Sequence, residues 1–223
     1  MDKSVLYSYP ISNYSGMVRD VIYRLELPID IRDPRELGGL KAQEYLAKFP
    51  TGKIPALEVG DLKLYESSVI LDYLLPSPAE GERKYYNLLA ARVHDIYHGA
   101  HQPILYRESS EEQRSAGLQA FRFTLDELDR ILELMKGPLF GGEEIGRGDL
   151  VYPTFGFYLH ILPNYYDFDV FTGRDSLGAW WAAIKRDSIC QKVLSEIAAG
   201  LQEWEDAGVF SKIYGKVSNV DFI

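Results

Sequence analysis

The first third of the chain changes repeatedly between the apolar spacing of a strand and that of a helix. Residues 5–9, VLYSY, form a β-prone run that ends at Pro10, and residues 28–33 form a second candidate strand. Between them apolar residues recur every three or four positions, which predicts an amphipathic helix over about 14–25.

A short helix, a hairpin and another helix follow. Residues 41–49 have helical spacing and stop at a Pro-Thr-Gly sequence. Residues 56–59 and 62–65 flank Gly60-Asp61, a two-residue loop that suits a type II′ turn. The next predicted helix starts after Glu66, with an apolar face made of Val69, Ile70, Tyr73 and Leu74. The order is strand, helix, strand, helix, hairpin, helix.

Residues 75–82, LPSPAEGE, form the best domain boundary in the chain. After it the apolar spacing is helical throughout, and residues 86, 89, 93 and 96 form the first stripe. We therefore predict one domain over 1–75, a linker over 76–81 and a helical bundle over 82–223. The further candidate helices cover 110–135, 149–162, 177–185 and 188–201.

Composition narrows the class of protein. The chain has 223 residues, is 46% hydrophobic and 26% charged, and reads as an ordinary soluble globular protein. The net charge of −9 argues against nucleic-acid binding, which needs a basic face. The single cysteine, Cys190, excludes an internal disulfide and is expected in the core. The sequence contains neither a signal peptide nor an apolar run long enough to cross a membrane, so we expect a cytosolic protein.

Residues 49–74 carry the most chemical information. Ile54-Pro55 precedes a strand, where a cis peptide is tolerated and leaves the backbone N–H and C=O of Ile54 facing outwards. Lys53 adds a cation beside them. Glu66-Ser67 at a helix N-terminus offers free N–H groups, a hydroxyl and a carboxylate, which together bind an anion and an amine. A short peptide with two carboxylates and one amine matches this set. The alternative is that Ser67 is only an N-cap.

Two other patterns have structural interpretations. Asp149 stands three residues after Gly146, as the acid of a capping box does, so we expect a folding role for it. His94, His98 and His101 share one helix face, and three imidazoles can bind zinc. No cysteine or His-Glu-x-x-His signature accompanies them. We therefore predict a polar interface there and no metal.

The chain resembles the glutathione S-transferases. The segments that carry the resemblance are TGKIPAL (51–57), GDLKLYESSVILDYL (60–74), ARVHDIY (91–97) and the GDL at 148–150. The resemblance covers most of residues 4–205 and is nearest to the serine-type, theta/zeta-like branch. It implies an α/β thioredoxin-like N-terminal domain, βαβαββα, followed by an all-helical domain. It also implies glutathione as co-substrate, no metal cofactor and a homodimer.

The resemblance assigns the glutathione-binding residues. Glu66 and Ser67 would hold the γ-glutamyl amine and carboxylate, and the backbone of Ile54 would pair with the cysteinyl unit. Lysines would face the glycyl carboxylate. The full predicted set is Lys41, Lys53, Ile54, Pro55, Glu66 and Ser67.

The glutathione thiol would then lie over the loop in YSYPISNYSGMVRD (7–20). The thiol partner of tyrosine-type relatives falls at Ser8, and that of serine-type relatives falls at Ser12. We predict that Ser12 donates to the sulfur, with Asn13 as the alternative donor and Tyr14 or Ser15 as weaker ones. Ser12 is also a candidate cap for the following helix, and the two roles are compatible.

The sequence departs from some relatives in ways that limit the reaction. The loop reads Ser12-Asn13-Tyr14 where maleylacetoacetate isomerases of the zeta class have Ser-Ser-Cys, which disfavours that activity. Thiol–disulfide chemistry of the omega type is disfavoured because the N-terminal region has no cysteine. Phe49 stands where many relatives have asparagine.

The second substrate is expected to be a small apolar electrophile bound between the domains. The residues predicted to line its pocket are Pro10, Ile11, Tyr14, His101, Ile104, Leu105 and Tyr158. The predicted function is attack of the glutathione thiolate on that electrophile. The alternatives are a non-catalytic interaction module with the same fold, and a glutathione-dependent peroxidase, lyase or dehalogenase.

Overall fold

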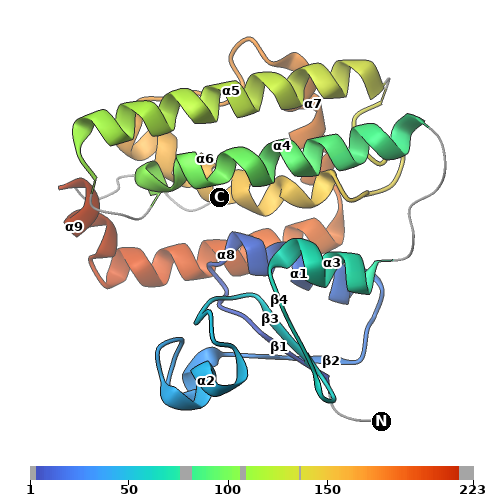
Figure 1. The fold of residues 1–223 in the computed structure, drawn as a ribbon. Coiled ribbons are helices and arrows are strands. Elements are labelled where there is room, and N and C mark those ends of the chain that lie inside the picture. The colour runs from blue at the N-terminus through green and yellow to red at the C-terminus, as the bar shows by residue number, and fades with distance from the viewer. Residues whose placement is uncertain (1–3, 76–81, 106–108, 136, 216–223) are drawn as a thin grey trace.

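A four-stranded sheet organises the N-terminal domain (Figure 1). The computed structural model describes residues 4–75, 82–105, 109–135 and 137–215, without some side chains of the helix over 82–105. The strand order is β2-β1-β3-β4, with β1 parallel to β2 and the other pairs antiparallel. The parallel pair requires a crossover, which α1 supplies. The strands are β1 (Ser4–Tyr7), β2 (Ile29–Arg32), β3 (Ala56–Val59) and β4 (Leu62–Tyr65), and α1 is Asn13–Arg24.

The predicted hairpin is confirmed. Val59 pairs with Leu62, so the loop contains two residues, and Gly60 has φ 56°. Positive φ at the first loop position is the requirement of a type II′ turn, and glycine meets it without steric cost.

The two faces of the sheet bury different residues because successive side chains point to opposite sides. Leu6 and Leu57 face α1 and α3 (Ser67–Leu74). Tyr7 faces the other side, towards α2 (Gln43–Lys48), and its ring centroid lies 5.7 Å from that of Phe49. Phe49 is fully buried there, so its role is packing. A short 3₁₀ helix, η1 (Pro34–Leu37), precedes α2.

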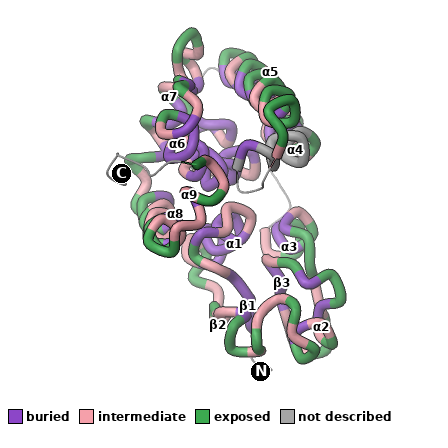
Figure 2. The backbone as a smooth tube through the Cα atoms, turned by 90° about the vertical axis from the view of Figure 1, so that its left-hand side faces the viewer, coloured by how far each residue is buried: buried purple, intermediate pink, exposed green. Residues whose placement is uncertain are grey.

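The C-terminal domain is helical and surrounds α6, whose tube is largely buried in Figure 2. The long helices α4 and α5 lie side by side, and α7 and α8 pack against the rest of the bundle (Figure 1). The fold class predicted from the sequence is confirmed. The elements are α4 (Glu82–Leu105), α5 (Glu111–Met135), η2 (Asp149–Val151), α6 (Tyr152–Tyr166), α7 (Asp175–Ile184), α8 (Ser188–Asp206) and α9 (Val209–Tyr214).

Helix α1 joins the two domains. One face packs on the sheet, and the other packs on α6 and α8. A Cβ atom on Gly16 would lie 3.0 Å from Pro153 Cβ and 3.3 Å from Val193 Cγ1, so the missing side chain lets the helices approach. The predicted linker, 76–81, lies outside the described residues, and the domain boundaries stay a prediction. None of the described helices is both long and apolar enough to cross a membrane.

The helices predicted from two apolar stripes are confirmed, but part of each stripe is exposed. On α3, Ile70 is fully buried, but Val69 and Tyr73 are 47% and 50% exposed. On α4, Leu89 and Ile96 are 46% and 61% exposed. Helical spacing shows which residues share a face, but it does not show whether the same chain covers that face.

The capping role predicted for Asp149 is confirmed. Its carboxylate accepts hydrogen bonds from the backbone N–H of Gly146 at 2.8 Å, of Gly141 at 2.8 Å and of Phe140 at 2.9 Å. The indole N–H of Trp180 donates to it at 2.9 Å. Asp149 is fully buried, so these four donors replace the water that the carboxylate loses on folding. It therefore fixes the loop before α6.

Candidate functional site

Ser12 lies at the N-terminus of α1, at the end of the loop that follows β1. Its backbone is extended, with φ −71° and ψ 114°, and its Oγ accepts a hydrogen bond from the N–H of Ser15 at 3.2 Å. The prediction that Ser12 caps the helix is therefore confirmed. The cap uses Oγ as an acceptor, which leaves the hydroxyl hydrogen to be donated to a sulfur nearby.

Ser8 is the position where tyrosine-type relatives would carry the partner of the thiol. Here it makes a structural contact. Its side chain is buried, and Arg19 Nη1 donates to its Oγ at 2.6 Å. The Ser8 hydroxyl itself points to the carbonyl of Tyr9, at 3.3 Å. Ser8 is therefore engaged within the protein on both sides of its hydroxyl group.

Asn13 is engaged at the interface between the domains. Its Nδ2 donates to Thr154 Oγ1 at 2.9 Å, and Thr154 Oγ1 lies 2.7 Å from His94 Nε2. Because Thr154 Oγ1 accepts from Asn13, its own hydrogen is free to be donated to Nε2, and Nδ1 of His94 then donates to Asp95 at 3.2 Å. Tyr14 lies next to this network, with its ring centroid 5.7 Å from that of His94. The Asn13 amide is thus used to join α1 to α6 and α4.

The turn before β3 supplies a peptide edge. The Ile54–Pro55 bond is cis, as predicted. The hydroxyl of Tyr45 donates to the carbonyl of Lys53 at 2.7 Å and so holds the turn against α2. Within the described residues, neither the backbone N–H nor the C=O of Ile54 has a hydrogen-bond partner. Both groups are therefore available to pair with an extended peptide.

Glu66 adopts a strained backbone conformation at the start of α3. Its φ is 69°, which costs a non-glycine residue about 1–3 kcal/mol. Glu66 is the N-cap residue, and its side chain makes no capping hydrogen bond. The interpretation of Ser67 as the cap is wrong, because Ser67 is the first residue inside the helix. Among the described residues, the Glu66 carboxylate therefore does not satisfy the first N–H groups of α3, and strain of this kind is common at ligand clamps.

Two lysines flank the same region. Lys41 and Lys53 are both exposed. A Cβ atom on Gly52 would lie 3.5 Å from Lys41 Nζ, which places that ammonium group beside the turn that carries Lys53. Two cations at one end of the turn suit a carboxylate.

The predicted electrophile-pocket residues fall into different environments. Pro10 is exposed and Tyr14 is partly buried, so both are accessible near Ser12. Ile11, at 9% exposure, Ile104 and Tyr158 are instead core residues, and the Tyr158 ring lies 4.0 Å from that of Phe121. A ligand reaches these three only after side chains move, which corrects the expectation that they line an open pocket.

The side chains of three other predicted residues, His98, His101 and Leu105, lie outside the described residues. Among the residues that are described, no group of three or more histidine, cysteine, aspartate or glutamate side chains has the arrangement of a metal site.

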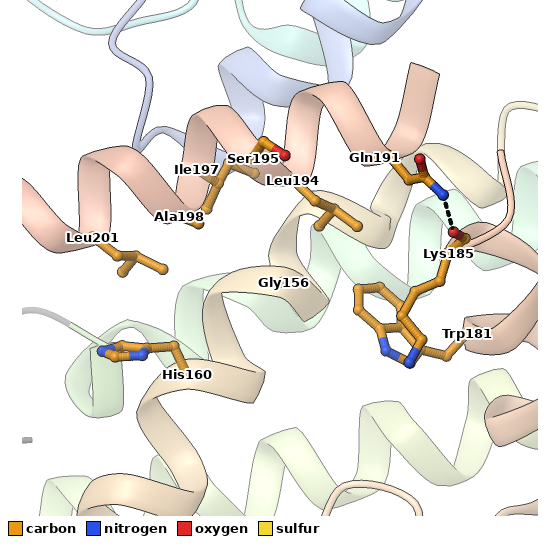
Figure 3. A pocket seen from close by; sticks show the side chains of 10 residues that line it. All are labelled: Gly156, His160, Trp181, Lys185, Gln191, Leu194, Ser195, Ile197, Ala198 and Leu201. Atoms are coloured by element: carbon orange, nitrogen blue, oxygen red, sulfur yellow. Dashed lines mark hydrogen bonds between the residues drawn. The ribbon is translucent and has the colours of Figure 1, made fainter. Parts of the chain in front are cut away.

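A separate cavity of about 320 Å³ lies between α6, α7 and α8 (Figure 3). Trp181 and Lys185 approach it from α7 and its C-terminal end, and Leu194 and Leu201 approach from α8 (Figure 3). His160 lines it from α6. None of the residues predicted to bind glutathione or the electrophile lines this cavity.

Comparisons with known proteins show which family the N-terminal part of the chain resembles. Residues 6–81 match the family described as "Glutathione S-transferase, N-terminal domain". "Probable glutathione S-transferase GSTF1" of Oryza sativa subsp. japonica is 27% identical over 178 residues, which is 71% of this chain and 80% of that protein. The N-terminal part of the chain is therefore similar to the glutathione S-transferases. Its matched segment contains Ser12, the cis Pro55 and Glu66.

Solved structures extend the likeness to both domains at the level of the fold. Glutathione S-transferase-I bound with lactoylglutathione has a TM-score of 0.70 at 20% identity and covers 87% of this chain and 99% of that one. A glutathione transferase from Methylococcus capsulatus str. Bath has a TM-score of 0.73 at 21% identity, with 88% and 99% covered. These likenesses establish the fold.

Several residues that shape the site carry no signal in the sequence. Arg19 and Thr154 look like ordinary helix residues, and their partners lie far away along the chain. Arg19 pairs with Glu196, 177 positions later, and Asn13 reaches Thr154, 141 positions later. Only the packing of α1 against the helical domain reveals them.

Proposed function

We propose that the protein is a serine-type glutathione transferase that activates the glutathione thiol for attack on a small apolar electrophile. The observation that carries this proposal is the state of Ser12. It lies at a helix N-terminus and its Oγ accepts the capping bond, so its hydrogen can be donated. The same domain offers the free peptide edge of Ile54 and the uncapped helix start at Glu66 and Ser67. The theta/zeta-like branch and the cytosolic location stay predictions from the sequence.

The chemistry follows from the pKa of the thiol. A cysteine-type thiol has a pKa of about 8.5, so only a few per cent is ionised at neutral pH. A hydrogen bond from Ser12 and the positive end of α1 both favour the thiolate. Lowering the pKa by about two units stabilises the thiolate by roughly 2.7 kcal/mol and makes it the major form. The sulfur then forms a bond to the electrophilic carbon, and a leaving group departs with its electron pair when the reaction is a substitution.

The proposed glutathione-binding residues hold the tripeptide in position. In the proposed complex, Glu66 takes the γ-glutamyl amine, and the hydroxyl and N–H of Ser67 take its carboxylate. The backbone of Ile54 pairs with the cysteinyl unit, and Lys41 and Lys53 face the glycyl carboxylate. Holding the tripeptide at three points places the sulfur over Ser12 and lowers the entropic cost of the reaction.

A two-fold homodimer is part of the proposal. Val69 and Tyr73 on α3 and Leu89 and Ile96 on α4 belong to apolar stripes that the chain leaves 46–61% exposed. Tyr65 on β4 adds a further exposed ring. Exposed apolar residues on neighbouring elements are typical of a surface that a second subunit covers, and two-fold symmetry is the commonest arrangement.

The test begins with retention on immobilised glutathione and conjugation of a chloronitrobenzene. We expect wild-type protein to bind and turn over, and Ser12→Ala to bind but to lose about 10²-fold in kcat. Ser12→Ala also removes a helix cap, so Ser110→Ala, which removes the serine cap of α5, is the matched control. It should retain full activity.

Each outcome separates the candidate functions. A wild-type protein that neither binds glutathione nor conjugates it would be a non-catalytic module with this fold, and the proposal would fail. A Ser12→Ala variant with wild-type kcat would end the assignment of Ser12 and turn attention to Asn13. Turnover of peroxides or of halogenated or ether substrates, without conjugation of the chloronitrobenzene, would favour the peroxidase, dehalogenase or lyase alternative.

A further inference from the structure

Arg19 is a buried cation directly behind the loop that carries Ser12. Only 2% of the residue is exposed. Nη1 donates to Ser8 Oγ at 2.6 Å and to the carbonyl of Tyr9 at 2.9 Å, and Nη2 donates to the carbonyl of Pro10 at 2.8 Å. Nε donates to Glu196 Oε2 at 2.7 Å. The planar guanidinium group thus binds three consecutive residues of the loop and one carboxylate of the helical domain at once.

Glu196 is itself held in place on α8. Its second oxygen, Oε1, accepts the hydroxyl of Tyr23 at 2.8 Å. Burial and this hydrogen bond raise the pKa of Tyr23, so the phenol stays protonated and keeps donating. Lys192 Nζ lies 3.3 Å from the centroid of the Tyr23 ring and covers it. Both oxygens of Glu196 are therefore engaged, and its orientation towards Arg19 is fixed from two sides.

The loop that Arg19 holds is connected to Ser12 by a shared acceptor. The carbonyl of Tyr9 accepts the N–H of Ser12 at 3.1 Å as well as Nη1 of Arg19 at 2.9 Å. The residue before Ser12, Ile11, contacts α8 directly, because a Cβ atom on Gly200 would lie only 2.6 Å from both Cβ and N of Ile11. A displacement of the Tyr9 carbonyl would therefore move the Ser12 backbone.

We propose that Arg19, oriented by Glu196, is a positioning residue for the thiol-activating Ser12. Arg19 makes its contacts with the loop backbone and Ser8, and its effect reaches the sulfur through the Tyr9 and Pro10 carbonyls. The helical domain thereby sets the direction of the hydrogen bond that ionises the thiol in the other domain. The inference rests on the proposed function, since it concerns the same sulfur.

The experiment compares two conservative variants with a matched control. Arg19→Lys keeps the charge opposite Glu196 but loses the fork, because an ammonium group does not span the Ser8, Tyr9 and Pro10 oxygens together. Glu196→Gln keeps an oxygen acceptor and removes the ion pair. Arg24→Lys is the control because Arg24 also joins α1 to the start of α8, through Asp187, without touching the loop.

Four quantities are measured for each variant. They are the pKa of bound glutathione from the ultraviolet absorbance of its thiolate, kcat and KM for glutathione, and the urea midpoint of unfolding. We expect Arg19→Lys to raise the thiol pKa by about one unit and so to lower kcat about threefold at neutral pH, with KM for glutathione changed less than about twofold. Glu196→Gln should give a smaller change of the same kind. Arg24→Lys should lower the urea midpoint and leave the thiol pKa and kcat at wild-type values.

The opposite pattern would overturn the inference. If Arg19→Lys and Glu196→Gln lower the urea midpoint as Arg24→Lys does, with wild-type thiol pKa and kcat, then Arg19 is only a structural ion-pair partner and the proposed function stands. If Arg19→Lys does not fold, Glu196→Gln decides by the same two quantities. A wild-type protein that binds glutathione without forming thiolate would overturn the proposed function and this inference together.

Discussion

Replacing Gly200 by alanine measures how closely the Ser12 loop must approach α8. The new Cβ atom would lie 2.6 Å from Cβ and N of Ile11. Ordinary carbon–carbon contacts are about 3.5–4.0 Å, so the two segments must separate by roughly 1 Å. Such overpacking costs about 1–3 kcal/mol. Alanine gains about 1 kcal/mol over glycine inside a helix, so the net change in the free energy of unfolding is a loss of up to about 2 kcal/mol.

The effect on activity is expected to exceed the effect on stability. Ile11 directly precedes Ser12, so a shift of the loop moves the hydroxyl away from the sulfur. A displacement of about 1 Å can cost up to about 10²-fold in rate, and we expect kcat of Gly200→Ala to fall between about tenfold and 10²-fold. The matched control is Gly178→Ala in α7, where the new Cβ atom meets no described residue outside its own helix within 4 Å. It should gain up to about 1 kcal/mol and keep wild-type kcat.

Urea unfolding followed by tryptophan fluorescence, together with conjugation of a chloronitrobenzene at saturating glutathione, measures both quantities. The reasoning is refuted if Gly200→Ala is stabilised as much as Gly178→Ala and retains wild-type kcat. That result would mean that the loop has room to spare at α8 and that its distance from the helix does not set the rate.

Three further predictions follow from single contacts. Glu66→Gly should raise KM for glutathione at least about tenfold, because glycine lacks the carboxylate. It should not lower stability, because glycine accepts φ 69° without strain. Steady-state kinetics and urea unfolding measure the two effects. Burial opposes ionisation of Asp187, but Arg24 and the N–H of Cys190 lower its pKa from 3.8 to about 2. That stabilisation is present above about pH 4 and is lost towards pH 2, so Asp187→Asn should cost about 1–2 kcal/mol at neutral pH, with the difference from wild type shrinking on acidification in urea titrations. Ile96→Glu should shift the protein towards monomer in light scattering, because it places a charge on the proposed subunit contact; an unchanged dimer mass would contradict that surface.

Local patterns in the sequence are sufficient for much of the fold. The hairpin over 56–65 follows from two alternating runs around Gly60-Asp61, and the structure confirms both strands. Helix α1 begins one residue before its predicted start because Ser12 is its cap. Part of the apolar face of α3 and of α4 is exposed, which the sequence does not reveal, because apolar spacing reports a shared face without identifying the surface that covers it.

Only part of the candidate site can likewise be predicted from local patterns in the sequence. Ile54, Pro55, Glu66 and Ser67 lie within 14 positions of one another, so their spacing along the chain is enough to indicate a clamp. The contacts that hold the loop before Ser12 join residues of the two domains. Arg19 meets Glu196 only because α1 packs on α8, and no short-range pattern predicts a pair 177 positions apart.

The chain's one thiol lies at the centre of the contact between α1, α6 and α8. Cys190 is fully buried, with its sulfur 3.7 Å from Asp20 and 3.6 Å from Arg24 Nη2, and burial and the Asp20 carboxylate raise its pKa. A thiol reagent therefore modifies it only when these helices separate. The labelling rate of the wild-type protein then reports the free energy of separating these helices, and no engineered cysteine is needed.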